Sequence, residues 1–198
     1  SAARAAEADS GGPEPSRLVG ISPGTFEMGS ARPNAGELRV REVTISRPYR
    51  IQQQEVTVGD YARCVSRHAC TRPGCAASDS SADAMTCVNR EQSEALCRWA
   101  GMRLRTEAER EFAARAGAKL GIEGMSGGAA EWVADAFEAD LGTRAATDPI
   151  VRWSAGMKGV LRGGTPESRS SETAFTKRYA LNASVARVGT GFRCATDG

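Results

Sequence analysis

The order of its local sequence signals predicts that this chain adopts an α+β fold with a mixed or antiparallel sheet. Short apolar stretches with turn signals occupy residues 17–51, three helical patterns follow in residues 57–117, and short strands between long loops fill the rest. This segregation of strands and helices is typical of α+β domains. A length of 198 residues suits one domain, and 22 glycines indicate many turns.

The strand predictions come from short apolar stretches. Two of them flank residues 23–24, a Pro-Gly pair typical of a turn between strands. Val43 and Ile45 alternate with polar residues, which predicts a half-buried strand, and Tyr49 and Ile51 extend the pattern. Ahead of them, residues 1–16 are small, polar and contain proline, so we expect a disordered linker or stalk before one domain at residues 17–198.

Three helices are predicted from their start signals. Each begins with a capping residue whose side chain can bond the backbone three residues later, where a second polar side chain can return the bond. We expect the second helix to end at Gly101 and the third at Gly117, because glycine favours the left-handed turn after a helix. The three capping pairs are Thr57 with Asp60, Asn89 with Gln92, and Thr106 with Glu109.

The signals weaken after the third helix. Residues 121–128 form a glycine-dense loop, residues 131–135 a short apolar segment, and residues 142–149 another loop. Residues 160–162 and 191–195 are typical of core strands separated by a long polar segment.

Composition excludes several classes of function. A net charge of +2 gives no broad basic field, so we expect no nucleic-acid partner. The sequence has no apolar run long enough for a membrane span, so we expect no membrane insertion. The only histidine is His68, which excludes metal sites built from two or more imidazoles. We expect His68 to be exposed and without a chemical role.

The cysteines predict disulfides. Four of the six lie within residues 62–88, a polar stretch without apolar periodicity that needs covalent support. Because no Cys-x-x-Cys spacing occurs, a zinc site or free thiols are the less favoured alternative. Six cysteines permit 15 pairings, and spacing alone does not choose among them. Disulfides imply a periplasmic, cell-surface or secreted location. The cysteines are Cys64, Cys70, Cys75, Cys87, Cys97 and Cys194.

Six segments, taken together and in order, resemble the formylglycine-generating-enzyme (sulfatase-modifying factor) superfamily. The resemblance spans residues 20–195 and implies a C-type-lectin-like α+β fold with little regular secondary structure. It also implies a disulfide between Cys97 and Cys194. The segments are GTFEMGS, QQEVTVGDYARCV, CRWAGMRLRTEAEREFAARAG, GMSGGAAEWVAD, VLRGG and GFRCA.

The residues implied to carry the family's oxidase chemistry are missing. Its two copper-binding thiols correspond to Ser168 and Thr173, whose hydroxyls are poor ligands for Cu(I), so we expect no copper. A tryptophan that lines the family's active groove is replaced by Ala130. The sulfoxide-synthase relatives need three histidines, which this chain lacks.

The resemblance also bears on calcium. Only residues 118–120 separate Gly117 from Gly121, so the loop that carries one of the family's two calcium sites is missing. The second site maps onto backbone carbonyls and one carboxylate, and with a single acidic ligand a weak or empty site is an alternative outcome. Its residues are Gly124, Gly127, Ala129 and Glu131.

The segment after the RGG block is the predicted contact surface. It is polar and lies where the family places its groove, so we expect its side chains to face solvent and to contact a ligand or a partner protein. A merely solvated surface is the alternative. Arg162, in the block itself, is expected to bond carboxylates or carbonyls beneath the loops. The predicted ligand-binding residues are Ser168, Arg169, Ser170, Glu172, Thr173 and Arg178.

These observations predict a non-catalytic, extracytoplasmic module that binds a ligand or a protein through its C-terminal loops. One alternative is an oxidoreductase-type enzyme with copper or another metal at a non-standard thiol such as Cys75 or Cys87. Another is a structural subunit of a surface assembly.

Overall fold

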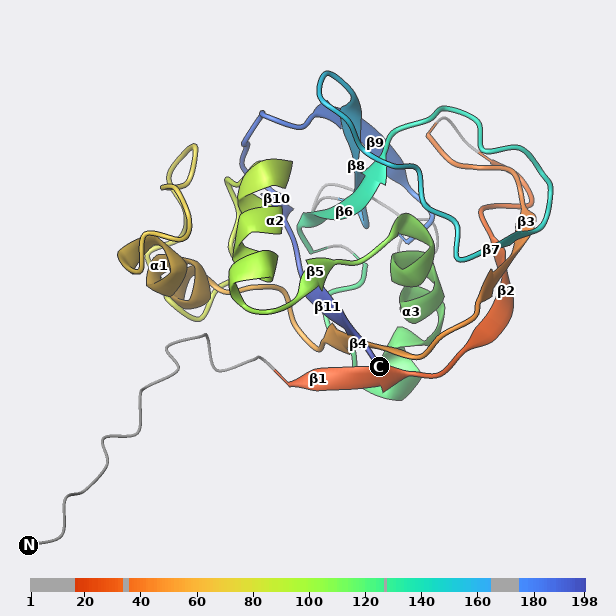
Figure 1. The fold of residues 1–198 in the computed structure, drawn as a ribbon, viewed down its shortest axis with the longest axis horizontal. Helices are drawn as coiled ribbons and strands as arrows, with labels where there is room; N and C mark the ends of the chain where they lie inside the picture. The colour runs from red at the N-terminus through yellow and green to blue at the C-terminus, as the bar shows by residue number, and fades with distance from the viewer. Residues whose placement is uncertain (1–16, 34–35, 127, 165–174) are drawn as a thin grey trace, which may run out of the picture.

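The computed structural model describes residues 17–33, 36–126, 128–164 and 175–198 (Figure 1). The predicted linker at residues 1–16 lies outside them. Within the described residues, three sheets and three helices form the α+β arrangement expected from the sequence. Figure 1 shows α1 (Val58–Ser66) at one side of the molecule and the pair β2 (Gly24–Met28) and β3 (Arg41–Ile45) at the other. Helices α2 (Arg90–Trp99) and α3 (Glu107–Leu120) lie between them.

The first sheet joins the two ends of the described chain. Its strands pair antiparallel in the order β1-β4-β11-β5, so that Val19 lies opposite Ile51, and Ile51 opposite Ala195. The C-terminal strand is therefore central rather than an edge. The strands are β1 (Leu18–Ile21), β4 (Tyr49–Gln52), β11 (Cys194–Asp197) and β5 (Arg103–Leu104).

The other two sheets are mixed, because each contains one parallel pair. In the four-stranded sheet β10-β6-β8-β9, Glu131 lies opposite Arg162, and Arg162 opposite Arg178. Its strands are β10 (Thr190–Gly191), β6 (Ala130–Ala136), β8 (Lys158–Arg162) and β9 (Arg178–Asn182). The three-stranded sheet contains β2 (Gly24–Met28), β3 (Arg41–Ile45) and β7 (Ala146–Thr147).

Two strand predictions need correction. Tyr49 and Ile51 do not continue the strand of Val43 and Ile45: β3 pairs with β2, whereas β4 belongs to the first sheet. Pro48 between them has no N–H for a sheet ladder. The apolar segment at residues 191–195 is likewise two strands in different sheets, β10 and β11.

All three helices begin where the capping pairs predict, and each has both bonds of a capping box. The third helix continues past Gly117 and ends at Gly121, which has the left-handed φ of 70°. The prediction of its end was wrong because Gly117 packs within the helix against Met125, whereas Gly121 makes the turn. The helices are α1 (Val58–Ser66), α2 (Arg90–Trp99) and α3 (Glu107–Leu120).

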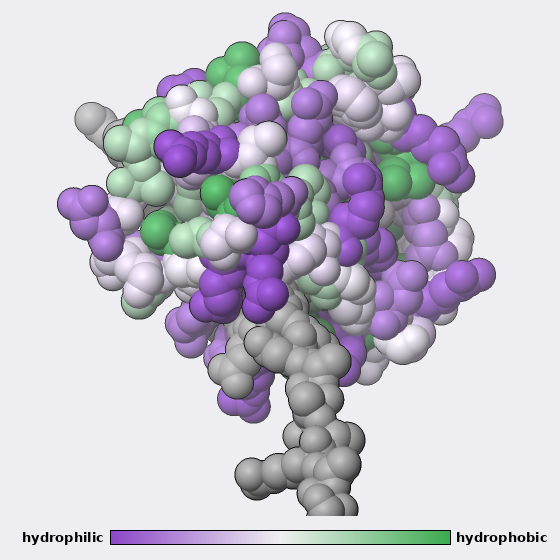
Figure 2. Space-filling model, turned by 60° about the vertical axis from the view of Figure 1, so that its left-hand side comes forward, coloured by the Kyte–Doolittle hydropathy of each residue, from purple (hydrophilic) through white to green (hydrophobic). Residues whose placement is uncertain are grey.

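Two apolar clusters form the core. One lies around Trp132, whose side chain is fully buried and donates a hydrogen bond to the Val88 carbonyl oxygen at 2.9 Å. The other lies between α3 and strands β2 to β4 and includes Val43 and Ile51. On the face drawn in Figure 2, hydrophobic residues lie singly or in small groups among hydrophilic ones. No helix of the described ranges combines the length and apolarity that a membrane span needs.

Candidate functional site

All six cysteines are paired. The disulfide implied by the resemblance, Cys97–Cys194, is present and joins α2 to β11 within the core. The other two disulfides are Cys64–Cys70 and Cys75–Cys87. Cysteine spacing alone had not chosen between these and the other possible pairings. Because Cys75 and Cys87 are bonded to each other, neither offers a thiolate to a metal.

Of the predicted ligand-binding residues, five lie outside the described ranges: Ser168, Arg169, Ser170, Glu172 and Thr173. The expectation that Arg178 faces solvent is wrong. Its side chain is buried, and its guanidinium donates to both carboxylate oxygens of Glu107 and to the Glu138 carbonyl oxygen. A buried arginine with a carboxylate partner does not serve as an exposed ligand contact.

Arg162 anchors the residues that directly follow the predicted contact surface, residues 165–174. As predicted, its buried guanidinium bonds carboxylates and carbonyls: those of Glu107 and Glu111, and the carbonyl oxygens of Phe175 and Thr176. The carbonyl bonds measure 3.0 and 3.1 Å. This arginine therefore anchors the chain directly after residues 165–174.

The first glycine of the RGG block is required by packing. Gly163 has a φ of +104°, which disfavours other residues, and a Cβ placed there would lie 2.2 Å from Nη2 of Arg110. The turn after β8 therefore rests directly on a buried arginine of α3.

Glu131 lies at the centre of a buried ion-pair cluster. Its carboxylate accepts hydrogen bonds from the guanidinium groups of Arg105, Arg110 and Arg193, and all four side chains are fully buried. Burial alone would raise the pKa of Glu131, but the three cations lower it to about 2. This residue is ionised and already has its partners.

This geometry does not fit the calcium site that the resemblance implies. Both oxygens of Glu131, the only acidic ligand of that set, accept bonds from arginines, so the carboxylate is not available to a cation. Ala129 is buried, Gly124 is exposed, and Gly127 lies outside the described residues. Within those residues, no three His, Cys, Asp or Glu side chains are placed together to hold a metal.

The carboxylate beside the glycine-rich loop is Glu55, which the sequence reasoning missed. Its Oε1 accepts a hydrogen bond of 3.2 Å from the Ala129 amide, and its Oε2 would lie 3.3 Å from a Cβ on Gly124. Burial, and then the charge of Glu131, raise the pKa of Glu55 to about 7, although Arg193 lowers it. The sequence did contain a signal for Glu55. It is a charged residue directly before the apolar Val56, within the segment QQEVTVGDYARCV that carried the family resemblance.

Glu55 lines an open cavity of about 240 Å³. Gln54 and Glu123 also line it, and the Gln54 amide donates to the Glu123 carboxylate at 2.8 Å. Loop residues 82 and 84 form part of the wall. A carboxyl group with a raised pKa at a cavity is a candidate contact for a polar ligand.

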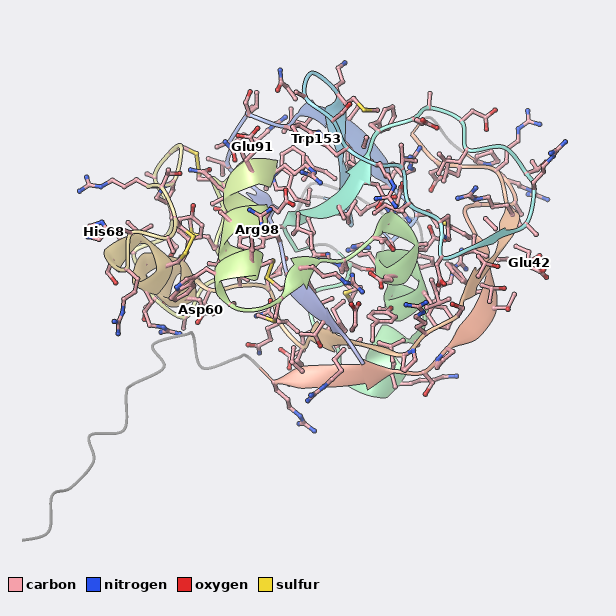
Figure 3. The ribbon with its side chains drawn as sticks, in the orientation of Figure 1. Glu42, Asp60, His68, Glu91, Arg98 and Trp153 are labelled. Atoms are coloured by element: carbon pink, nitrogen blue, oxygen red, sulfur yellow. A yellow bond between two sulfur atoms is a disulfide. The ribbon has the colours of Figure 1, made fainter. Side chains whose placement is uncertain are left out.

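His68 takes no part in these sites. It is exposed in the turn after α1 and has a φ of 59°. Figure 3 places it on the outer side of α1. No sequence feature or contact of His68 indicates a chemical role.

The sheets, the three disulfides and the irregular loops define a protein of the C-type-lectin-like class. The model of the "sulfatase-modifying factor enzyme 1-like domain" family matches residues 3–120 and 118–198, so the chain belongs to that family. No curated protein sequence matches the chain significantly.

Solved structures with similar folds share little sequence with this chain. PvdO from Pseudomonas aeruginosa is 20% identical with a TM-score of 0.77, and the match covers 91% of this chain and 94% of PvdO. Treponema denticola variable protein 1 is 18% identical with a TM-score of 0.71, over 91% and 95% of the two chains. CarF is 15% identical with a TM-score of 0.67, over 93% and 99%. At these identities, the likeness concerns the fold.

Proposed function

We propose that the chain is a non-catalytic, extracytoplasmic module that binds a ligand or partner protein on a sulfatase-modifying-factor scaffold. The observation that supports this proposal best is the state of the sulfur atoms. Hydroxyl residues occupy positions 168 and 173, and all six cysteines form disulfides, so no thiolate remains for copper. Three disulfides also support an oxidising location.

The contact surface in this proposal is the segment 165–174. Its two ends are anchored, one at the Gly163 turn on Arg110 and the other by the bonds of Arg162 to residues 175 and 176. A polar segment whose flanking residues are held by a rigid scaffold is suited to recognition. Arg178 is not part of this surface, because its charge is neutralised inside the protein.

Thiol titration tests the non-catalytic proposal. We expect the unreduced, denatured protein to show no reactive thiol, and the folded protein to bind no Cu(I) at stoichiometric ratio. One or two reactive thiols together with tight Cu(I) binding would overturn the proposal in favour of an oxidoreductase.

Site-specific photo-crosslinking tests the contact surface. A photoreactive side chain at Ser170 is compared with one at Glu91, an exposed residue on α2 that Figure 3 labels. In the organism that encodes the chain, we expect crosslinks from position 170 and none from position 91. Equal crosslinking would contradict the proposal, and stoichiometric co-purification with a surface complex would favour a structural subunit.

A further inference from the structure

Arg41 differs from the other buried arginines of the described chain. Each of the others has a carboxylate within salt-bridge distance, and Arg41, at the start of β3, has none there. Its side chain is largely buried, with a residue exposure of 8%. Its Nη1 donates to the Leu141 carbonyl oxygen at 3.1 Å. Its Nε is buried without a hydrogen-bond partner, as are those of Arg90, Arg105 and Arg162, so the missing carboxylate is what sets Arg41 apart. An unpaired buried cation costs stability unless an anion joins it.

Arg41 lines a cavity of about 210 Å³ between β3, the start of α3 and residues 141–151. Its walls are largely apolar, formed by side chains such as Met28, Leu141 and Ile150. Ile150 is 44% exposed and lies where the cavity meets solvent. The neighbouring Glu42 points the other way, out from β3 into solvent (Figure 3).

The acidic side chains at this cavity already have other partners. Glu107 accepts bonds from Arg162 and Arg178. The two oxygens of Asp135 accept bonds from the backbone amides of Glu107, at 2.6 Å, and Val151, at 3.0 Å. Burial, and then the charge of Glu107, raise the pKa of Asp135 to about 7, so its negative charge is partial near neutrality.

The charged side chains around the cavity, together with the ion pairs that they form, carry more positive than negative charge. Four cations lie near three acids in this group, and Arg41 is the cation without a described acid within salt-bridge distance. The charges of Glu107, Asp135 and Glu111 nevertheless act on it from further away. Arginine is suited to a carboxylate partner because its planar N–H groups match the two oxygens. The cationic residues are Arg41, Arg115, Arg162 and Arg178, and the acids are Glu107, Glu111 and Asp135.

We propose that this cavity binds a small aliphatic carboxylate, with the carboxylate on Arg41 and the alkyl chain against Met28, Leu141 and Ile150. The site is separate from the contact surface at residues 165–174, and the proposal does not depend on that surface. The size of the cavity favours a ligand of a few carbon atoms.

Calorimetric titration and thermal unfolding with propionate test the proposal, with propionamide and propylamine as neutral and cationic probes of similar size. We expect only propionate to bind and to raise the unfolding temperature. Butyrate should bind more tightly, by up to about fourfold for one added methylene. Absence of saturable propionate binding, or equal binding of the three probes, would overturn the proposal.

Two variants separate ligand binding from a structural role. Arg41→Met removes the charge and keeps the bulk, and Arg39→Met is the matched control, because Arg39 is exposed two residues earlier. We expect Arg41→Met to fold with unchanged or higher stability in the absence of propionate, and to lose propionate affinity at least tenfold. Arg39→Met should bind as the natural chain does. Destabilisation of Arg41→Met without any response of the natural chain to propionate would indicate a structural arginine.

The resonance of the Arg41 Nε–H group gives a second readout. Propionate should shift this resonance in the natural chain, and a shift limited to surface arginines would contradict the site. A glutamate side chain of a partner protein carries the same chemical group, so N-acetylglutamate amide is titrated beside propionate. Preference for propionate supports a free acid as the ligand, and preference for the blocked glutamate would overturn it in favour of a protein partner.

Discussion

Two irregular regions of this molecule are held in place by different means. Between α1 and α2, the polar stretch of residues 67–88 is fixed by the disulfides Cys64–Cys70 and Cys75–Cys87. Around α3, the glycine-rich loop and the RGG turn rest on buried arginines paired with carboxylates. A disulfide acts mainly on the unfolded chain, whereas a buried ion pair depends on complete pairing within the folded protein. The first region should therefore respond to reductant and the second to charge removal and pH.

The largest effect is expected from removal of the charge at the centre of the second region. Glu131→Gln leaves Arg105, Arg110 and Arg193 buried without their shared anion. Because unpaired buried charges are costly, we expect a loss of about 3–5 kcal/mol or more in the free energy of unfolding, measured by urea titration.

The control for this variant is Glu91→Gln, on the exposed start of α2, which should change stability by less than about 0.5 kcal/mol. If Glu131→Gln does not fold, Arg193→Lys keeps the positive charge and should give a smaller, measurable loss. A loss below about 1 kcal/mol in Glu131→Gln would show that the cluster is not essential to this region.

The second-largest effect is expected from removal of a disulfide in the first region. Replacement of both cysteines of either pair, Cys64/Cys70 or Cys75/Cys87, by alanine should cost roughly 2–3 kcal/mol, as chain entropy predicts for short loops. Hydrogen exchange should accelerate in residues 67–88 and remain slow in α3. If the two regions are independent, a chain that combines the cysteine replacements with Arg193→Lys should lose the sum of the two separate losses in the free energy of unfolding, within about 0.5 kcal/mol. Faster exchange in α3 would contradict the separation.

The third effect is a pH dependence confined to the second region. The pKa of Glu55 rises to about 7 on folding, so the folded state holds a proton that the unfolded state releases near its ordinary value. This contribution to stability is present at low pH and is lost as the pH rises towards and through 7. Glu131 acts oppositely: with a pKa of about 2 in the folded state, its contribution declines as the pH falls below its ordinary pKa and is lost as the pH falls through 2.

Glu55→Gln should therefore flatten the decline of stability between pH 5 and 8, by on the order of 1–2 kcal/mol. The Gln side chain can keep an oxygen for the Ala129 amide. Asp135, with a pKa also raised to about 7, should leave a residual slope. Urea titrations at several pH values measure the change, and an unchanged slope would contradict the role of Glu55.

The same contrast explains what could be predicted from the sequence. Capping pairs such as Thr106 with Glu109 were predicted because their partners lie three residues apart. The bond between Cys97 and Cys194 followed only from the family resemblance. The partners of Glu131 lie 21 to 62 residues away, and no local pattern pairs them. Arg178 was placed wrongly for this reason: a charged residue in a polar stretch suggests exposure unless its distant partner is known. For Glu131, the sequence indicated a role in the glycine-rich block but not its arginine partners.

The smallest expected effect is that of calcium removal. A calcium ion at the glycine-rich loop would stabilise it through a carboxylate, but Glu131 is already neutralised by arginines. We therefore expect EDTA, or added millimolar calcium, to leave the unfolding temperature unchanged at neutral pH. A rise in that temperature with calcium that is absent in Glu55→Gln would contradict this expectation. It would then identify Glu55, the carboxylate that contacts Ala129, as the cation ligand, and the second region would depend on a metal as well as on its ion pairs.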